Sequence, residues 1–541
     1  MAWNLQGYPG RVNDDEGTYT TEAWAIISLH RLAPYTYWYD HPPLGWATIA
    51  AWAWLTDGFH RASRAVMIGR EVMWLATIIS SALLYGVARK LELRRPGAAG
   101  AVLLFGLSPL AIWYHRTVSL DNMSTMWALA AFMVAVSRRR SMGAAFWSAV
   151  CFAAASLSKE TVIVILPALV WQLWQHTDRR TRSWNIGIFI TTYVLIVLFY
   201  PLFGILRGEF LPGRGHVSLI GSVEYQLLSR QGSGSLLDSH SGTFAMAHSW
   251  VSLDPWLTFG GLAMMFAGFM IRRLRPAALA LLLQLAIMAK GGYVPFAFGV
   301  GMLPFAALLV AGTLDNLWEL SFTGRGRRAH AAAELAPPWL VNCGRALVAV
   351  ALLIFCGFAL PHWASFLRQQ SGVNEFSNQQ AATQWIIHHV PPGKIVVVDD
   401  YPWLDLTLRS NTMPLWLWKI NSDPQVTHAL LRHGYKDISY LELEPKSSLT
   451  FAALPGRPTL TAALDHSRVV ARFGSMSIYK VVKTPVKTSA CAADAHQRSG
   501  LFPGRPGRTR VATQLGHAFH SRCGPGRRHA KRPLTPPAAG R

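Results

Sequence analysis

Three acidic residues, Asp14, Asp15 and Glu16, stand side by side near the start of a chain that is 51% hydrophobic and only 15% charged. A carboxylate can act as a general base when it lies within hydrogen-bond reach of the group that attacks the substrate. The alternative role is structural, because acids that precede a helical stretch cap its N-terminus and complement its dipole. This stretch alone leaves both roles open.

A second polar group of residues lies in the stretch YWYDHPPLGW, which spans residues 37–46. Pro42 and Pro43 fix an extended turn there, and the tryptophans on either side are typical membrane-interface anchors. The following segment, 44–56, is apolar but too short to span a bilayer, so we predict a helix lying in the outer interface. His41 is a candidate ligand for phosphate or a metal, with simple hydrogen bonding in the loop as the alternative.

Several further residues could bind an anion or a cation beside these acids. Arg116 and Lys159 each lie at the mouth of an apolar segment, where they would bind an anionic ligand or snorkel to the headgroups. Asp121 follows as a second acid, which could hold a divalent ion, orient Arg116 or cap the next helix. The long connection 207–254 contains Arg230, a candidate second phosphate contact, although this connection could also be a solvated linker.

The elements that position these residues are mostly membrane helices, as the high hydrophobic content and 22 Trp indicate. The formal net charge of +23 does not indicate nucleic-acid binding, because no recognition module interleaves aromatic and basic residues. Apolar runs long enough, or nearly so, to cross about 30 Å of hydrocarbon occur at 66–88, 97–114, 120–137, 142–158, 161–175, 184–206, 255–271, 276–290, 295–313 and 340–361.

The charges of the connecting loops predict which side each loop faces. Every second connection is basic, beginning with RKLELRRP after the first span, and such loops remain in the cytoplasm. This assignment places the opening acids and everything after residue 361 outside, in a multi-pass protein of the plasma membrane. An exported amino terminus needs a span to carry it across, so we expect the natural reading frame to include one more helix upstream.

The last part of the chain changes character. Residues 362–483 alternate helical, strand and turn patterns and predict a small external α/β domain. KIVVV reads as a buried strand followed by a turn, and SRVVARFGSMSIYKV as a closing strand. The tail has eleven cations and one acid without periodicity, so we predict disorder. The predicted organisation is a first external loop with its juxtamembrane helix, a transmembrane domain of about ten helices, the α/β domain and the tail, at 1–65, 66–361, 362–483 and 484–541.

The order of acid pair, helix, HPPL motif, interfacial helix and Arg-bearing span resembles the membrane glycosyltransferases of the GT-C fold. Within that fold it resembles the protein O-mannosyltransferases and the lipid A aminoarabinose transferase, the glycosyltransferase family 39-like group. DDEGTY and DHPPLGW match their signatures. The resemblance implies a polyprenyl-phosphate sugar donor, a hydroxyl or amine acceptor and inversion at the anomeric carbon. Asp15 then matches the catalytic aspartate, and Glu16 its partner.

The sequence therefore predicts a polytopic α-helical enzyme that transfers a sugar, with mannose as the first choice, to a protein or cell-envelope acceptor outside the membrane. In this reaction the polyprenyl phosphate is the leaving group, and its negative charge must be stabilised. A divalent metal cation, or Arg116, Lys159, Arg230 and His41, could supply the positive charge. No other cofactor and no nucleic-acid partner is expected. A transporter or flippase for a lipid-linked sugar is the alternative, although the spans lack acids in their centres and no half-repeat is evident.

Overall fold

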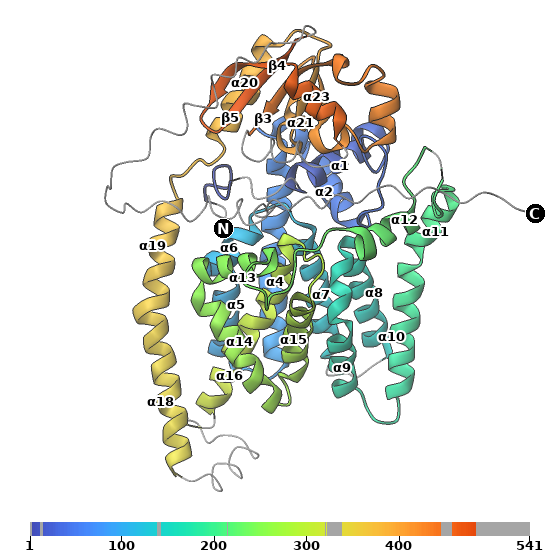
Figure 1. The fold of residues 1–541 in the computed structure, drawn as a ribbon. Helices are drawn as coiled ribbons and strands as arrows, with labels where there is room; N and C mark the ends of the chain where they lie inside the picture. The colour runs from blue at the N-terminus through green and yellow to red at the C-terminus, as the bar shows by residue number, and fades with distance from the viewer. Residues whose placement is uncertain are drawn as a thin grey trace, which may run out of the picture.

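The computed structural model describes residues 3–10, 15–137, 142–213, 215–319, 321, 338–444 and 457–482. Asp14 and the predicted basic tail 484–541 lie outside the described residues. A bundle of roughly parallel helices forms the lower part of the molecule, and a layer of short helices covers one end of it (Figure 1). A small α/β domain lies on this layer, so the polar motifs of the first loop lie between the bundle and the domain.

Helices of the bundle occupy all ten predicted apolar ranges. Four of the described helices are long and apolar enough to cross a membrane, or five if the bent pair α5 and α6 forms one span. Others, such as α7 and α15, have 16 residues, about 24 Å of helix, so the number of crossings stays a prediction. The bounds are α4 (Val66–Lys90), α5 (Arg95–Leu107), α6 (Pro109–His115), α7 (Leu120–Ala135), α8 (Met142–Ser158), η1 (Glu160–Ile165), α9 (Leu166–His176), α10 (Arg182–Val197), α11 (Phe199–Leu206), α14 (Pro255–Met270), α15 (Arg275–Lys290), η3 (Phe296–Met302), α16 (Leu303–Trp318), α18 (Pro338–Ile354), η5 (Phe355–Ala359) and α19 (Leu360–Gln370).

The covering layer begins with α1, whose first turn carries Asp15 and Glu16. Helix α2 coincides with the predicted interfacial segment 44–56 and exposes Trp54 and Leu55. Both side chains are apolar, as contact with lipid at the interface would require. Helix α3 follows α2 in the first loop, and the remaining elements of the layer come from the long connection. The bounds are α1 (Asp15–Leu29), α2 (Leu44–Thr56), α3 (Gly58–Arg61), α12 (Leu219–Glu224), η2 (Tyr225–Ser229) and α13 (Gly242–Leu253).

The α/β domain contains one five-stranded sheet with the order β2-β1-β3-β5-β4. Strand β1 is parallel to β2 and β3, whereas β5 is antiparallel to β3 and β4. The predicted single closing strand is the hairpin β4–β5, and a helix, α21, follows β1 where a turn was expected. The bounds are α20 (Ser377–His389), β1 (Ile395–Val398), α21 (Asp400–Arg409), β2 (Met413–Trp416), η6 (Leu417–Lys419), η7 (Val426–Leu430), η8 (Gly434–Asp437), β3 (Ile438–Leu443), α23 (Pro458–Asp465), β4 (Ser467–Phe473) and β5 (Met476–Val481).

The domain and the first loop share a hydrophobic core. Tyr35 belongs to the same cluster of buried side chains as the sheet, and its ring lies edge-on to Trp403 and Trp416. Helix α1 packs on α21 at Gly17, where a Cβ atom would lie 2.3 Å from the backbone carbon of Asp400. This close approach needs glycine, because only a residue without a side chain lets the two backbones meet. The first loop and the domain therefore form one packed layer.

Candidate active site

Asp15 begins a row of polar residues along one face of α1. Residues 15, 19 and 22 are spaced so that they lie on the same side of a helix. The Tyr19 ring stacks on Trp46 with 6.4 Å between centroids, and its centroid is 6.1 Å from that of His41. Burial raises the pKa of Tyr19, and the negative charges of Asp15, Asp40 and Asp121 raise it further. The acids from three separate segments thus surround one buried phenol.

His41 joins the predicted HPPL loop to Lys159. Nζ of Lys159 lies 2.7 Å from Nε2 of His41, and Nδ1 of His41 lies 3.0 Å from Oε2 of Glu160. An ammonium group can only donate, so Nε2 accepts and Nδ1 donates to Glu160. The hydroxyl groups of Tyr37 and Tyr200 both donate to the carbonyl oxygen of His41. These contacts fix the histidine against the lysine.

Lys159 is a buried cation with several carboxylates around it. Its side chain is 3% exposed. Burial lowers the pKa of Lys159, but the charges of Glu160, Asp121 and Asp15 outweigh this effect and raise the pKa above its ordinary value. Lys159 therefore stays charged at neutral pH and acts electrostatically on the predicted catalytic acid. The two residues are 144 positions apart in the sequence (159 − 15).

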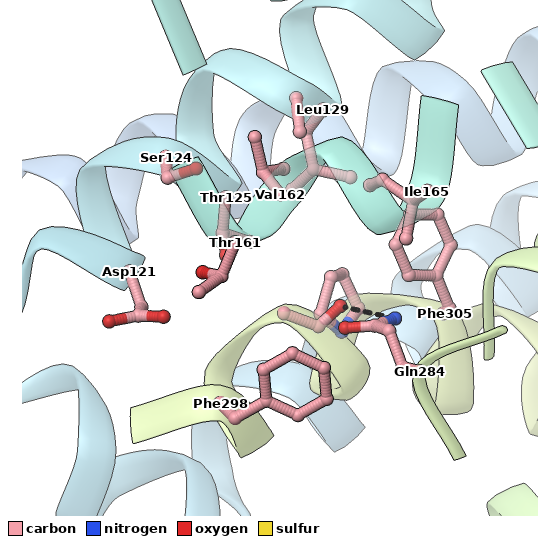
Figure 2. Close-up of a pocket in the computed structure, with 13 residues that line it drawn as sticks. Asp121, Ser124, Thr125, Leu129, Thr161, Val162, Ile165, Gln284, Phe298 and Phe305 are labelled. Atoms are coloured by element: carbon pink, nitrogen blue, oxygen red, sulfur yellow. Dashed lines mark hydrogen bonds between the residues drawn. The ribbon is translucent and has the colours of Figure 1, made fainter. Parts of the chain in front are cut away.

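Asp121 lies in the first turn of α7, at one end of a narrow cavity. Its Oδ2 accepts a hydrogen bond from the hydroxyl of Ser119 at 3.0 Å. Ser119, and not Asp121, is the N-cap of α7, which corrects the capping alternative. Figure 2 shows the Asp121 carboxylate beside Ser124, Thr125 and Thr161, with apolar side chains farther inside. The cavity of about 20 Å³ has room for about one water molecule.

Arg230 reaches this region through Tyr293, a residue that the sequence interpretation did not select. The guanidinium carbon of Arg230 lies 3.3 Å from the centroid of the Tyr293 ring. Burial raises the pKa of Tyr293, Arg230 lowers it, and Asp15 raises it. Gly291 and Gly292 precede the tyrosine with φ angles of +86° and +105°, which favour glycine and shape the turn. The phenol thus contacts the arginine and is influenced by the charge of the predicted base.

Glu16 has its own surroundings on another face of α1. Its carboxylate is fully buried and accepts hydrogen bonds from Nε and Nη2 of Arg70, at 2.9 and 3.0 Å. The backbone N–H of Val118 donates at 3.0 Å, and the hydroxyl of Tyr401 donates as well. Glu16 thus connects α1 to α4, to the loop before α7 and to α21. Its contacts are with protein groups, so any part in the reaction is to position Asp15.

Arg116 lies on the same side as Arg70, beneath the amino-terminal segment 3–10. Its side chain is 1% exposed, and its guanidinium carbon lies 4.5 Å from the Trp3 ring centroid. Nη2 donates to the carbonyl oxygen of Trp3. No ion pair joins it to Asp121 within the described residues, so the expected orientation of Arg116 by Asp121 is not present. Its predicted phosphate contact stays a prediction.

Comparisons with known proteins agree with this architecture. The family model for dolichyl-phosphate-mannose-protein mannosyltransferase matches residues 40–204. The structure of ArnT from Cupriavidus metallidurans bound to undecaprenyl phosphate matches with a TM-score of 0.55 and 15% identity, covering 89% of this chain and 95% of that one. The chain shares the GT-C fold of ArnT. Apo ArnT gives a TM-score of 0.53 with 14% identity, covering 89% of this chain and 95% of that one.

A more distant GT-C structure also matches. It is the Archaeoglobus fulgidus oligosaccharyltransferase tethered to an acceptor peptide with the NVT sequon, with a TM-score of 0.50 and 11% identity, covering 88% of this chain and 72% of that one. A sequence search of curated proteins finds no match. At these identities the structural likeness shows the fold.

Two half-exposed acids of this GT-C site were also not singled out by the sequence. Asp40 precedes His41 and forms no hydrogen bond or ion pair in the part of the chain that the structure describes. Tyr39 before it has a φ angle of +54°, an uncommon conformation for a bulky residue that is often found at functional sites. Glu160 is the partner of His41. The signal available for Asp40 was its place inside the DHPPL motif.

The predicted divalent cation can be tested against the donors that the fold brings together. A metal such as Mg²⁺ needs several oxygen ligands at short range. Among the described residues, no three His, Cys, Asp or Glu side chains are positioned to bind one ion together. Asp121 and its neighbours therefore do not form a ready metal site, and the reaction steps below involve only side chains.

Proposed function

We propose that this GT-C protein transfers one sugar from a polyprenyl-phosphate carrier to a hydroxyl or amine of a protein or cell-envelope acceptor, with inversion. Two comparisons support a lipid-linked donor: the family description names dolichyl-phosphate-mannose, and ArnT was solved with undecaprenyl phosphate. Mannose is the first sugar to test, and other hexoses or pentoses follow. The observation that carries the proposal is that the Asp15 carboxylate acts electrostatically on both Lys159 and Tyr293, and that Arg230 lies over the Tyr293 ring.

The chemistry needs one base and one source of positive charge. Asp15 accepts the proton of the acceptor hydroxyl or amine as its oxygen or nitrogen bonds to the anomeric carbon. The bond from that carbon to the phosphate oxygen breaks, and polyprenyl phosphate leaves with the electron pair. Because attack and departure occur on opposite faces of the sugar, one transfer inverts the configuration. A phosphate leaves as a stable anion, so no general acid is required, unlike in glycosidases.

Lys159 and Arg230 are the cations that would stabilise the departing phosphate. Lys159 is buried and held by His41, so its charge acts in surroundings that water screens poorly. Fixed charges of this kind stabilise the transition state because they need not reorganise during the reaction. Glu16 would keep the first turn of α1 in place through Arg70 and Tyr401. We assign the site to the outer face of the plasma membrane, with support from the basic loops on the opposite side.

The test uses purified protein and radiolabelled polyprenyl-phosphate sugars, with mannose, glucose and arabinose tried separately. The proposal predicts release of free polyprenyl phosphate and transfer of the label when an envelope extract supplies the acceptor. If none of the donors is consumed, the proposal fails. Label that crosses a vesicle membrane while it stays attached to its lipid would instead support a transporter.

A further inference from the structure

A second cavity lies on the side of α1 that Glu16 faces, away from Asp15. Its volume is about 360 Å³, within the range of small-ligand pockets. We call it the seam cavity because it lies between the start of α4, the amino-terminal segment and helices α20 and α21. Its walls include Gln6, Arg64, Phe376, Gln379, Gln384 and Tyr401.

Arg64 is the residue that gives the seam cavity its chemistry. Its side chain is 8% exposed, and its guanidinium carbon lies 4.5 Å from the Phe376 ring centroid. Nη2 donates to the carbonyl oxygen of Gln6, but Nε has no hydrogen-bond partner. No carboxylate forms an ion pair with Arg64 within the described ranges. A buried cation without a counter-ion is costly, so this arrangement favours a bound anion.

The neighbouring charges are already engaged. Arg70 pairs with Glu16, and Arg409 donates to the carbonyl oxygens of Ala62 and Ser63. Asp405, which also lines the cavity, accepts from the backbone N–H of Ala65 at 2.9 Å and pairs with Arg409 at 3.8 Å. Burial lowers the pKa of Arg64 and the positive charge of Arg70 lowers it further, whereas the negative charge of Asp405 raises it.

The other walls are suited to a sugar. Nε2 of Gln379 is buried without a hydrogen-bond partner, and α20 also contributes Thr383 and Gln384. Amide and hydroxyl groups of this kind can exchange hydrogen bonds with the hydroxyls of a saccharide. Phe376 and Tyr401 add apolar ring surface to the walls. The combination of one unpaired arginine, amides and aromatic rings recognises a sugar unit that carries an oxyanion.

We propose that the seam cavity binds a carboxylate- or phosphate-bearing sugar unit of the acceptor, remote from the group that receives the new sugar. This inference rests on the proposed transferase function, because it assumes a saccharide acceptor. Tyr401 lines the cavity and also donates to Glu16, the neighbour of Asp15. A sugar unit bound in the cavity would therefore contact the same tyrosine that holds α1 in place through Glu16.

The experiment measures binding to the full-length Asp15→Asn protein in detergent, so that turnover does not interfere. Glucuronic acid is the probe, glucose is its neutral counterpart, and inorganic phosphate is the competitor. We expect glucuronate to bind at least about ten-fold more tightly than glucose, because a charged hydrogen bond is worth more than a neutral one, and phosphate to displace it. Equal affinity for the two sugars overturns the inference. Displacement by phosphatidylglycerol but not by phosphate assigns the site to a lipid headgroup and also overturns it.

Variants locate the binding. Arg64→Gln should weaken glucuronate binding about ten-fold or more, whereas Arg432→Gln, at an exposed arginine, should leave it unchanged. Gln384→Trp keeps Arg64 but fills the mouth of the cavity from an exposed position, and it should also abolish binding. Binding that survives both Arg64→Gln and Gln384→Trp excludes the seam cavity. Because donor consumption by the wild-type protein is a separate assay, failure here leaves the proposed transferase function standing, and the reverse also holds.

Discussion

The hydroxyl group of Tyr401 offers a test of how the α/β domain controls the active site. In Tyr401→Phe the ring keeps its contact with Phe376, 5.4 Å between centroids, and only the hydrogen bond to Glu16 is lost. Glu16 retains Nε and Nη2 of Arg70 and the Val118 N–H as donors. A hydrogen bond to a charged group contributes about 1.5–3 kcal/mol. With three donors remaining, we expect a loss of about 2 kcal/mol.

The effect on activity follows from the position of Glu16 beside Asp15. A displacement of about 1 Å in a catalytic group can reduce the rate about 100-fold, so we expect turnover to fall about ten- to 100-fold while donor binding changes little. Turnover is measured with labelled donor, and stability by thermal unfolding followed through tryptophan fluorescence. Tyr435→Phe is the matched control, because that hydroxyl has no partner in the described part of the chain. If the two variants behave alike in both assays, the hydrogen bond between Tyr401 and Glu16 does not support the site.

Three further predictions concern single residues in and around the proposed site. Lys159→Gln should lower turnover about 100- to 1,000-fold, as loss of an oxyanion-stabilising group does, and unchanged turnover would remove Lys159 from the reaction. Burial and the charges of Asp40 and Asp400 raise the pKa of Glu22 in the folded protein. Unfolding therefore releases a proton, and the stability of the fold decreases as pH rises above about 4.5. Glu22→Gln should flatten this decrease in thermal unfolding scans from pH 5 to 9, and an identical slope in the variant and the wild-type protein would contradict the prediction. Gly17→Ala should destabilise the protein, because the Cβ of the alanine would collide with the Asp400 backbone. Gly187→Ala is the control and should not destabilise it, because a Cβ there would lie in open space. Equal stability of the two variants would contradict the close packing of α1 on α21.

The sequence predicted most elements because their signals are local. Apolar runs of helical length located the bundle, and KIVVV located β1. Strand β2 was missed because MPLW has four residues and contains a proline, which argues against a strand. Hairpin β4–β5 was read as one strand because the turn between Phe473 and Met476 is short. Short elements like these take their conformation from sheet pairing that local sequence does not reveal.

The site was predictable only where a motif or the position of a charged residue on an external connection indicated it. Asp15, His41, Lys159 and Arg230 were selected from the sequence, and the fold brings them into one region. The surroundings of Glu16 were not predictable, because its partner Tyr401 lies 385 residues away. Tyr293 carries no motif, and its role emerges only from the charges that meet around it. Contacts with residues that are distant in the sequence decide whether a charged residue takes part in the reaction or only stabilises the fold.

The claim that Asp15 is the base can be tested most directly by comparing Asp15→Asn with Asp57→Asn. Asp57 is an exposed acid between α2 and α3, so its variant controls for the loss of one carboxylate. Turnover of polyprenyl-phosphate sugar should fall at least about 100-fold in Asp15→Asn, the usual contribution of general-base catalysis, with thermal stability and donor binding retained. Near-normal turnover in Asp15→Asn would contradict the account.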